Sequence, residues 1–167
     1  MRICKTCPWT VPPFVYTNTG QAQKRGASAE IGRSCGGLTT KIHAVVDGLG
    51  NPINLLLSAG NEADISNAPP LLCTLSIKGS IVNGDKGYDS KAFVDWLKSI
   101  GAIPNIPSRE TNKVQRECDW WVYKERHLVE CFWQKIKQFR RVATRYDKLA
   151  TTFLGFVYLA SIFVLLK

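Results

Sequence analysis

Apolar and polar positions follow a helical period most clearly in residues 121–137, a stretch without Gly or Pro. On a helix of 3.6 residues per turn, Tyr123, Arg126, Glu130 and Lys137 fall within a stripe ~60° wide. The stripe holds one carboxylate, two cations and a phenol. We therefore predict one long helix that docks against the core through a set of apolar residues: Leu128, Val129, Phe132, Ile136 and Phe139.

The rest of the chain divides into shorter segments bounded by Gly, Pro and polar clusters. The predicted strands are 14–16, 38–47, 53–58, 80–85 and 102–106, and loops are expected at 17–34 and 107–117. The further predicted helices are 68–77, one capped by Asp89 or Ser90 that ends at Gly101, and 148–167. A hairpin over 38–58, followed by alternating helices and strands, predicts an α/β fold with a mixed sheet flanked by helices.

Residues 153–166 are almost wholly apolar. They are fewer than the ~18–20 residues needed to cross a bilayer, so we expect a buried core helix and no membrane association.

The charge balance points to a polyanionic partner, because 22 Lys and Arg face 13 Asp and Glu, a net charge of +9. Nucleic acid is favoured over a membrane surface. The run Lys135, Lys137, Arg140, Arg141, Arg145 and Lys148 is a candidate surface for DNA phosphates, or simply a solvated helix face.

The six cysteines show no framework spacing, and residues 1–13 lack the apolar core of a secretory signal. Cys4 and Cys7 resemble half of a zinc site, but no second pair completes it, so free thiols in the cytoplasm are expected.

Asp85 ends a predicted strand and is followed by Lys86 and Gly87. Ligand sites in α/β sheets commonly lie at the carboxyl ends of strands, and a glycine permits close approach. Taken alone, Asp85 is better interpreted as a turn or capping aspartate.

The polar stripe reads Tyr, two residues, Arg, three residues, Glu, six residues, Lys. Most such stripes are solvated faces with ordinary ion pairs, but this spacing resembles the signature around the catalytic glutamate of bacterial DDE transposases. The similarity is to the insertion-sequence-five group of the insertion-sequence-four-like superfamily. It covers about four-fifths of the chain, from Ile31 onward, and includes residues 31–43, 46–52, 85–90 and 140–148.

The resemblance implies a ribonuclease-H-like fold and an enzyme that cuts transposon-end DNA and transfers its 3′-ends to target DNA. Asp85 and Glu130 would be catalytic ligands of Mg²⁺ or Mn²⁺, the cations that prefer oxygen donors. Tyr123, Arg126 and Lys137 would position the inverted-repeat ends, with Arg140, Arg141 and Arg145 as further DNA contacts. The protein would act on the bacterial nucleoid, as a homo-oligomer on DNA.

The family pattern also places a first aspartate on the first strand, some twenty residues before Ile31. No Asp or Glu precedes Glu30 in this chain. We therefore divide it into an atypical segment, 1–30, and a DDE domain, 31–167. To explain the missing aspartate, we hypothesise that the reading frame is truncated or frameshifted, so that residues 1–16 are translated out of frame or from unrelated sequence. We then expect the activity of this chain to be impaired.

Two alternatives follow. The chain could be a non-catalytic DNA-binding remnant that interferes with full-length transposase, or a ribonuclease-H-like nuclease unrelated to transposition. The tryptophans are expected in the core, although one of Trp120, Trp121 and Trp133 could stack on an unpaired base.

Overall fold

The computed structural model describes residues 14–22, 31–34 and 37–166. Its sheet is built around β1 (Phe14–Ala22) and β3 (Gly37–Val46), which pair antiparallel from Phe14 opposite Val46 to Gln21 opposite Thr39. On its other edge β3 pairs antiparallel with β4 (Pro52–Ala59) and, near its start, with the short β2 (Gly32–Ser34).

The second half of the sheet is parallel. β1 pairs with β5 (Ile81–Asn83) through Phe14 and Asn83, and β5 pairs with β6 (Ile103–Asn105). The order across the sheet is therefore β4, β3, β1, β5, β6. The predicted mixed α/β sheet is confirmed.

The predicted hairpin is confirmed, with β3 and β4 joined by a tight turn. The Asp47 carboxylate accepts hydrogen bonds from the backbone N–H of Leu49 (2.8 Å) and Asn51 (2.9 Å). Gly50 lies between them with a φ of 83°, a conformation that side chains other than glycine rarely adopt.

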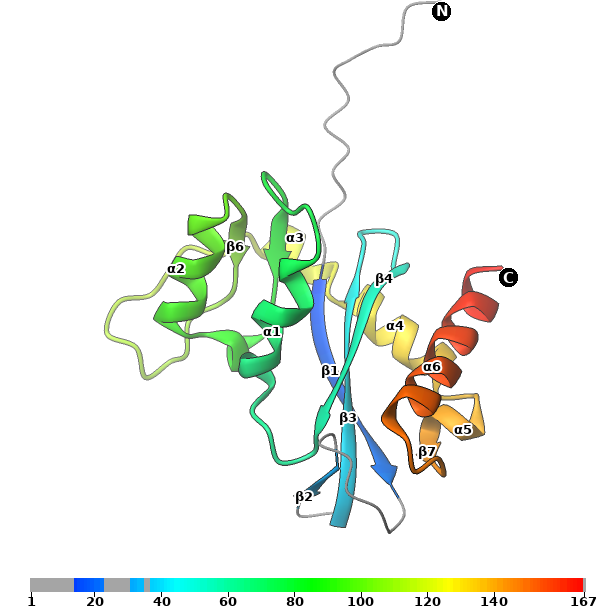
Figure 1. Ribbon diagram of the computed structural model, residues 1–167. Coiled ribbons are helices and arrows are strands. Elements are labelled where there is room, and N and C mark those ends of the chain that lie inside the picture. Colours follow the sequence, from blue (N-terminus) through cyan, green and yellow to red (C-terminus); the bar gives the residue numbers. More distant parts are fainter. Residues whose placement is uncertain (1–13, 23–30, 35–36, 167) are drawn as a thin grey trace, which may run out of the picture.

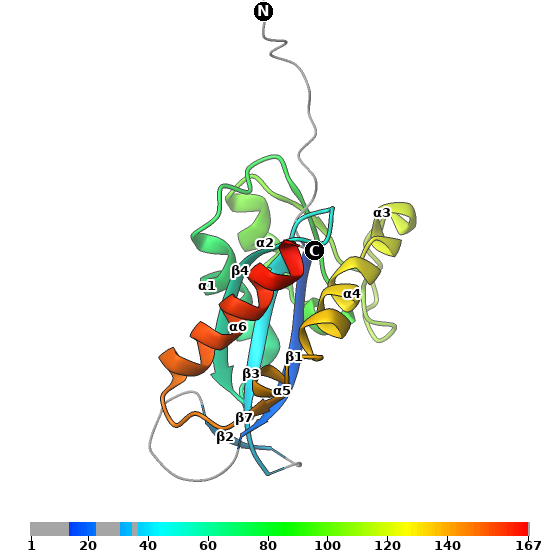
Figure 2. The same ribbon diagram turned by 90° about the vertical axis from the view of Figure 1, so that its right-hand side faces the viewer.

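Helices cover both faces of the sheet (Figures 1 and 2). One face packs α4 (His127–Ile136), α5 (Arg140–Ala143) and α6 (Ala150–Leu165) against β3 and β4, with a core that includes Ile42, Leu57, Phe132, Ile136 and Phe153. The other face packs α1 (Asp64–Cys73) and α2 (Lys91–Ser99), with a core that includes Val45, Leu72, Val82, Tyr88 and Leu97.

The helix predicted at residues 148–167 is present as α6, but it is only partly buried. Phe153, Val157 and Ala160 face the core, whereas Leu159 and Phe163 are more than half exposed. The prediction of a buried core helix therefore holds for one face alone. Among the described residues, every helix is too short or too polar to span a bilayer.

Several other segments differ from the prediction. Residues 17–22 and 32–34, expected in a loop, extend β1 and form β2, because pairing with β3 satisfies their backbone groups. The helix expected over 121–137 is divided into α3 (Trp120–Lys124) and α4. The short strand β7 (Thr144–Arg145), which follows α5 and pairs with the end of β1, was not predicted.

His43 is a buried polar residue with a hydrogen-bond partner. It is buried on β3, and its Nε2 lies 2.7 Å from the Ser58 Oγ. Burial lowers the pKa of His43 to about 4, so the ring is neutral at pH 7.

The burial of Arg145 contradicts the prediction that this residue contacts DNA, because its side chain is only 1% exposed. The guanidinium donates hydrogen bonds to Thr40 Oγ1 (2.6 Å) and to the carbonyls of Asp147 and Lys148 (3.0 Å each). Its Cζ also lies 5.4 Å from the centre of the Phe153 ring. Arg145 therefore fastens the segment before α6 to β3.

Replacing this buried guanidinium should destabilise the protein. We expect Arg145→Ala to lower the free energy of unfolding by about 3 kcal/mol, because the acceptors around it lose a charged donor. Arg140 is exposed, so Arg140→Ala should change the free energy of unfolding by less than about 0.5 kcal/mol. Urea denaturation of both variants measures the difference, and equal stabilities would contradict the buried role of Arg145.

Candidate functional site

Asp85 follows β5 and caps the single turn η1 (Lys86–Tyr88). Its Oδ1 accepts a hydrogen bond of 2.8 Å from the Gly87 N–H. A Cβ on residue 87 would lie only 2.8 Å from the same oxygen, so a glycine lets the turn hold the carboxylate in this way. Asp85 is thus a turn-capping residue that also stands at the carboxyl end of a strand.

The start of α3 is tied to the end of β5 by two buried amides. Asn105, on β6, donates from Nδ2 to Asn83 Oδ1 (2.6 Å) and to the Asp119 carbonyl (3.1 Å). Its Oδ1 accepts from the Asp119 N–H at 2.8 Å. Asp119 in turn caps α3, accepting from the N–H groups of Trp121 (2.9 Å) and Val122 (3.1 Å). These hydrogen bonds fix α3 relative to the strand that leads to Asp85.

The junction of α3 and α4 is a tight turn. The N–H groups of Glu125 and Arg126 bond to the carbonyls of Val122 and Tyr123 at 3.1 Å, three residues back. Three residues per turn eclipse positions three apart, so Arg126 lies over Tyr123, with its Cζ 5.5 Å from the ring centre. Arg126 Nη2 also lies 3.2 Å from Glu130 Oε1.

Electrostatics connect this helix to Asp85. Burial raises the pKa of Tyr123, the charge of Asp85 raises it further, and Arg126 opposes the change. The phenol is therefore protonated at neutral pH. Arg126 contacts both Tyr123 and Glu130, and Asp85 lies near enough for its charge to act on the Tyr123 phenol. We call these four residues the acidic–basic series.

A divalent cation is the cofactor implied for this site. Asp85 and Glu130 supply the carboxylate oxygens that Mg²⁺ prefers, from two different elements. Yet the described residues contain no group of three or more His, Cys, Asp or Glu side chains that could hold a metal ion. The two carboxylates are therefore of the chemical type that binds a divalent cation, but they are too few to complete its site.

The remaining predicted DNA contacts lie elsewhere on the helical face. Lys137 ends α4, and it is exposed, as are Arg140 and Arg141 on α5. The Arg141 Cζ lies 4.6 Å from the centre of the Phe156 ring, and its Nη1 lies 3.8 Å from Asp147 Oδ1. Trp133 is a core residue, only 3% exposed.

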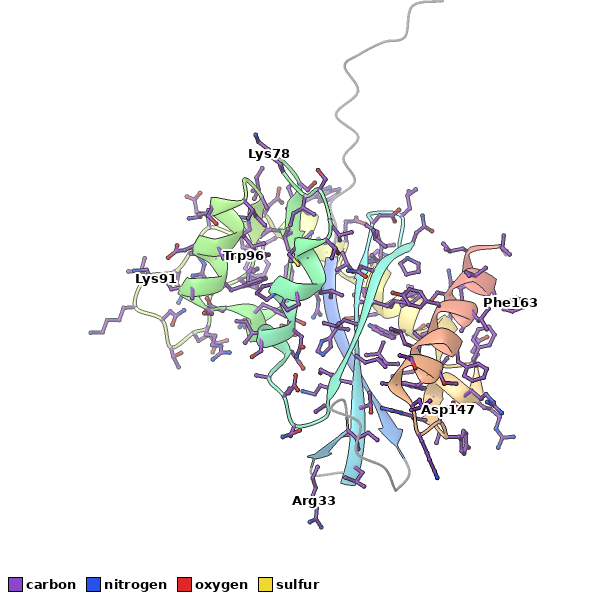
Figure 3. All side chains as sticks on the ribbon, viewed as in Figure 1. Arg33, Lys78, Lys91, Trp96, Asp147 and Phe163 are labelled. Carbon is purple, nitrogen blue, oxygen red and sulfur yellow. The ribbon has the colours of Figure 1, made fainter. Side chains whose placement is uncertain are left out.

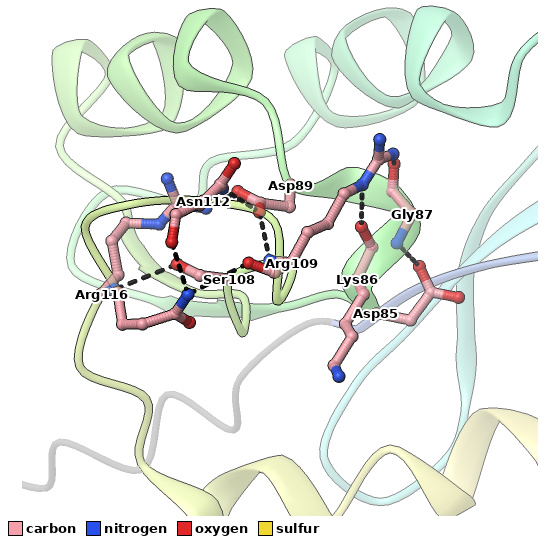
Figure 4. A network of polar contacts seen from close by, with 9 residues as sticks. Asp85, Lys86, Gly87, Asp89, Ser108, Arg109, Asn112 and Arg116 are labelled. Atoms are coloured by element: carbon pink, nitrogen blue, oxygen red, sulfur yellow. Dashed lines mark hydrogen bonds and ion pairs between the residues drawn. The ribbon is translucent and has the colours of Figure 1, made fainter.

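Of the two caps predicted for α2, Ser90 is the N-cap residue and Asp89 is not. Its buried carboxylate instead binds the loop of residues 107–117 (Figure 4). Oδ2 accepts from the Arg109 N–H (2.6 Å) and from Asn112 Nδ2 (2.7 Å), and Oδ1 contacts the Arg116 guanidinium.

The same loop also contacts the turn that carries Asp85. Lys86 Nζ and Glu110 Oε1 are 2.8 Å apart, and Arg109 Nε donates to the Lys86 carbonyl at 3.1 Å. The roles of Asp89, Asn83 and Asn105 were missed by sequence reasoning. In the sequence, only the proximity of Asp89 to Asp85 pointed to any of these roles, because the partners of all three residues are distant in sequence.

Comparison with known proteins identifies the family to which the chain belongs. The family described as "Transposase DDE domain" matches residues 2–165, and this chain belongs to it. The match includes the segment 1–30 that the sequence analysis set apart.

Individual relatives agree with this family. The chain is 38% identical over 133 residues to a candidate transposase for insertion sequence element IS6501 from Brucella ovis, covering 78% of this chain and all of that protein. It is 29% identical over 121 residues to a candidate transposase for element IS402 from Burkholderia cepacia, covering 66% of this chain and 55% of that protein.

A solved structure shares the fold. The piggyBac transposase in its synaptic complex with hairpin DNA superposes with a TM-score of 0.61 at 11% identity, over 90% of this chain and 45% of that chain. The chain thus spans about half the length of two of these three proteins.

Loss of the Asp89 carboxylate should release the loop of residues 107–117. We expect Asp89→Ala to lower the free energy of unfolding by about 2 kcal/mol, because charged donors lose their acceptor. Amide hydrogen exchange in this loop should become faster. Asp95→Ala, which removes an exposed carboxylate on α2, is the matched control. Unchanged exchange in Asp89→Ala would contradict this role.

Proposed function

We propose that this chain is a ribonuclease-H-like catalytic domain of an insertion-sequence-five-group transposase. The intact enzyme would cleave transposon-end DNA and transfer its 3′-ends to target DNA with Mg²⁺ or Mn²⁺. The observation that carries the proposal is the acidic–basic series, in which Arg126 contacts the Tyr123 ring and the Glu130 carboxylate, and the charge of Asp85, on a separate element, acts on Tyr123. Membership of the DDE transposase family supports it.

In this proposal Asp85 and Glu130 are the catalytic metal ligands. The chemistry that a divalent cation supplies at such a site is stabilisation of the attacking and leaving oxygens in phosphoryl transfer. Asp85 is held for this role by Gly87, and Glu130 by the docked helix α4.

Arg126 links the metal site to DNA. Its guanidinium lies on Tyr123 and against Glu130, and it is partly exposed. Exposed ion pairs of this kind contribute less than about 1 kcal/mol, so a DNA phosphate can replace the carboxylate as its partner. Tyr123 would donate its hydroxyl proton to a phosphate oxygen. Lys137, Arg140 and Arg141 would track the backbone further along, on a homo-oligomer assembled on the nucleoid.

We infer that strand transfer by this chain is impaired. The family's first aspartate belongs on the first strand, and β1 carries no acid. Asn83, which pairs with Phe14 of β1, has a buried Nδ2 without an acceptor among the described residues. In the family pattern, an aspartate on the first strand would be the third ligand.

The frameshift hypothesis for this difference is tested by translating the upstream DNA in all three frames. An aspartate-containing strand in another frame would support it. A purified chain that cuts and joins transposon ends in Mg²⁺ would contradict the impairment.

The missing acid and the exposed cations also favour a second function, a DNA-binding remnant that interferes with full-length transposase. Salt-sensitive DNA binding without metal-dependent cleavage would favour it. A nuclease unrelated to transposition is disfavoured by the complete Tyr–Arg–Glu–Lys spacing.

DNA binding can be tested without metal, by measuring affinity for a blunt duplex between about 50 and 200 mM salt. Arg126→Ala and Lys137→Ala should each weaken binding and reduce the slope of log K against log salt by about 1. Glu130→Gln should strengthen metal-free binding by about twofold to fivefold, because it removes a competing carboxylate.

The matched control is Lys91→Ala, an exposed lysine on α2 at the far side of the sheet (Figure 3). It should leave both affinity and slope unchanged. Equal effects of all four substitutions would contradict a specific DNA-binding face on α3 and α4.

A further inference from the structure

Two consecutive tryptophans begin α3 and are largely exposed. Trp120 is 60% and Trp121 is 78% exposed, whereas Trp133 on α4 is 3% exposed. Tryptophan is highly buried on average, because its ring has a large apolar area. An adjacent exposed pair therefore indicates a binding surface, which we call the indole platform.

The platform is held in place by the contacts around it. The Asp119 carboxylate caps the turn that carries both indoles, and Asn105 fixes the Asp119 backbone. The Trp120 ring meets the Tyr123 ring edge-on, with centres 5.5 Å apart. A preorganised surface loses little conformational entropy when a ligand binds.

The charges beside the platform are those of a nucleic-acid site. Lys124 Nζ lies 5.6 Å from the centre of the Trp121 ring, and Arg126 lies over Tyr123 on the same helical segment. Lys86 lies close enough to lower the pKa of Tyr123 by its charge. Aromatic faces interleaved with cations bind bases by stacking and phosphates by charge.

The occupant is further limited by the shape of DNA. In a duplex, each base is stacked between its neighbours, and only an unpaired base offers a free face to an indole. The Trp120 ring contacts Tyr123, whose ring also lies against Arg126, so the platform adjoins the acidic–basic series.

We propose that the indole platform stacks an unpaired base of the DNA bound at the acidic–basic series. This inference rests on the proposed function, and it adds that the bound DNA is opened or frayed at the site. Trp121 supplies the more exposed face, and Trp120 is braced by Tyr123.

The test compares two DNA probes, a blunt duplex and the same duplex with a short single-stranded 3′ overhang that carries 2-aminopurine. The protein should bind the overhang probe roughly tenfold more tightly, with quenched 2-aminopurine fluorescence, because stacking on an aromatic side chain contributes to affinity for each base. Trp121→Ala and the double variant Trp120→Ala/Trp121→Ala should lose the preference and the quenching while keeping affinity for the blunt duplex. Trp121→Phe should restore much of both.

Phe163→Ala, which removes an exposed aromatic ring on α6 (Figure 3), is the control and should behave as the wild type. Thermal unfolding confirms that each variant is folded. Retention of the overhang preference by the double variant would overturn the platform and leave the proposed function standing. Failure of the wild type to bind either probe at low salt would overturn both.

Discussion

The buried amide pair Asn83–Asn105 is the constraint on which the site depends. It connects the ends of two parallel strands, and through Asp119 it sets where α3 begins. A buried amide that loses its hydrogen-bond partner destabilises the protein, because no water replaces that partner. The connection therefore favours one arrangement of β5, β6 and α3 over slightly shifted ones. Asp85 lies two residues beyond Asn83, and Tyr123 lies four residues beyond Asp119. The separation between the two parts of the site is therefore set by this connection.

The tight turn between α3 and α4 places the proposed DNA contacts Tyr123 and Arg126 and the proposed metal ligand Glu130 on the same short segment. Arg126 is shared by the Tyr123 ring and the Glu130 carboxylate. Binding of a cation at Glu130 would leave Arg126 free to bind a phosphate, and binding of a phosphate at Arg126 would leave Glu130 free to bind a cation. The two binding events would therefore favour each other. In the proposed function, one arginine would therefore couple the metal site to the adjacent DNA contact.

Much of the fold could be predicted from the sequence where the pattern is local. The hairpin of β3 and β4, the helix α2 ended by Gly101 and the short strand before Asp85 all follow from periodicity and turn residues. The candidate residues Tyr123, Arg126 and Glu130 could be placed on one face for the same reason.

Features that depend on distant partners could not be predicted. Arg145 is buried because Thr40, 105 residues away in sequence, accepts its hydrogen bond. Asp89 binds a loop that begins nearly twenty residues later. The break at Glu125 has no Gly or Pro to reveal it, and residues 17–22 are a strand only because β3 pairs with them.

The central claim is that Asp85 and Glu130 belong to one metal site. Mn²⁺ titration followed by NMR tests this most directly, because a bound paramagnetic ion broadens the signals of nearby amides. The account predicts that amides of residues 85–88 and 123–130 broaden together, weakly and at the same Mn²⁺ concentration. Either Asp85→Asn or Glu130→Gln should abolish the effect in both segments. Broadening of one segment alone, or broadening of both that survives these substitutions, would contradict the shared site.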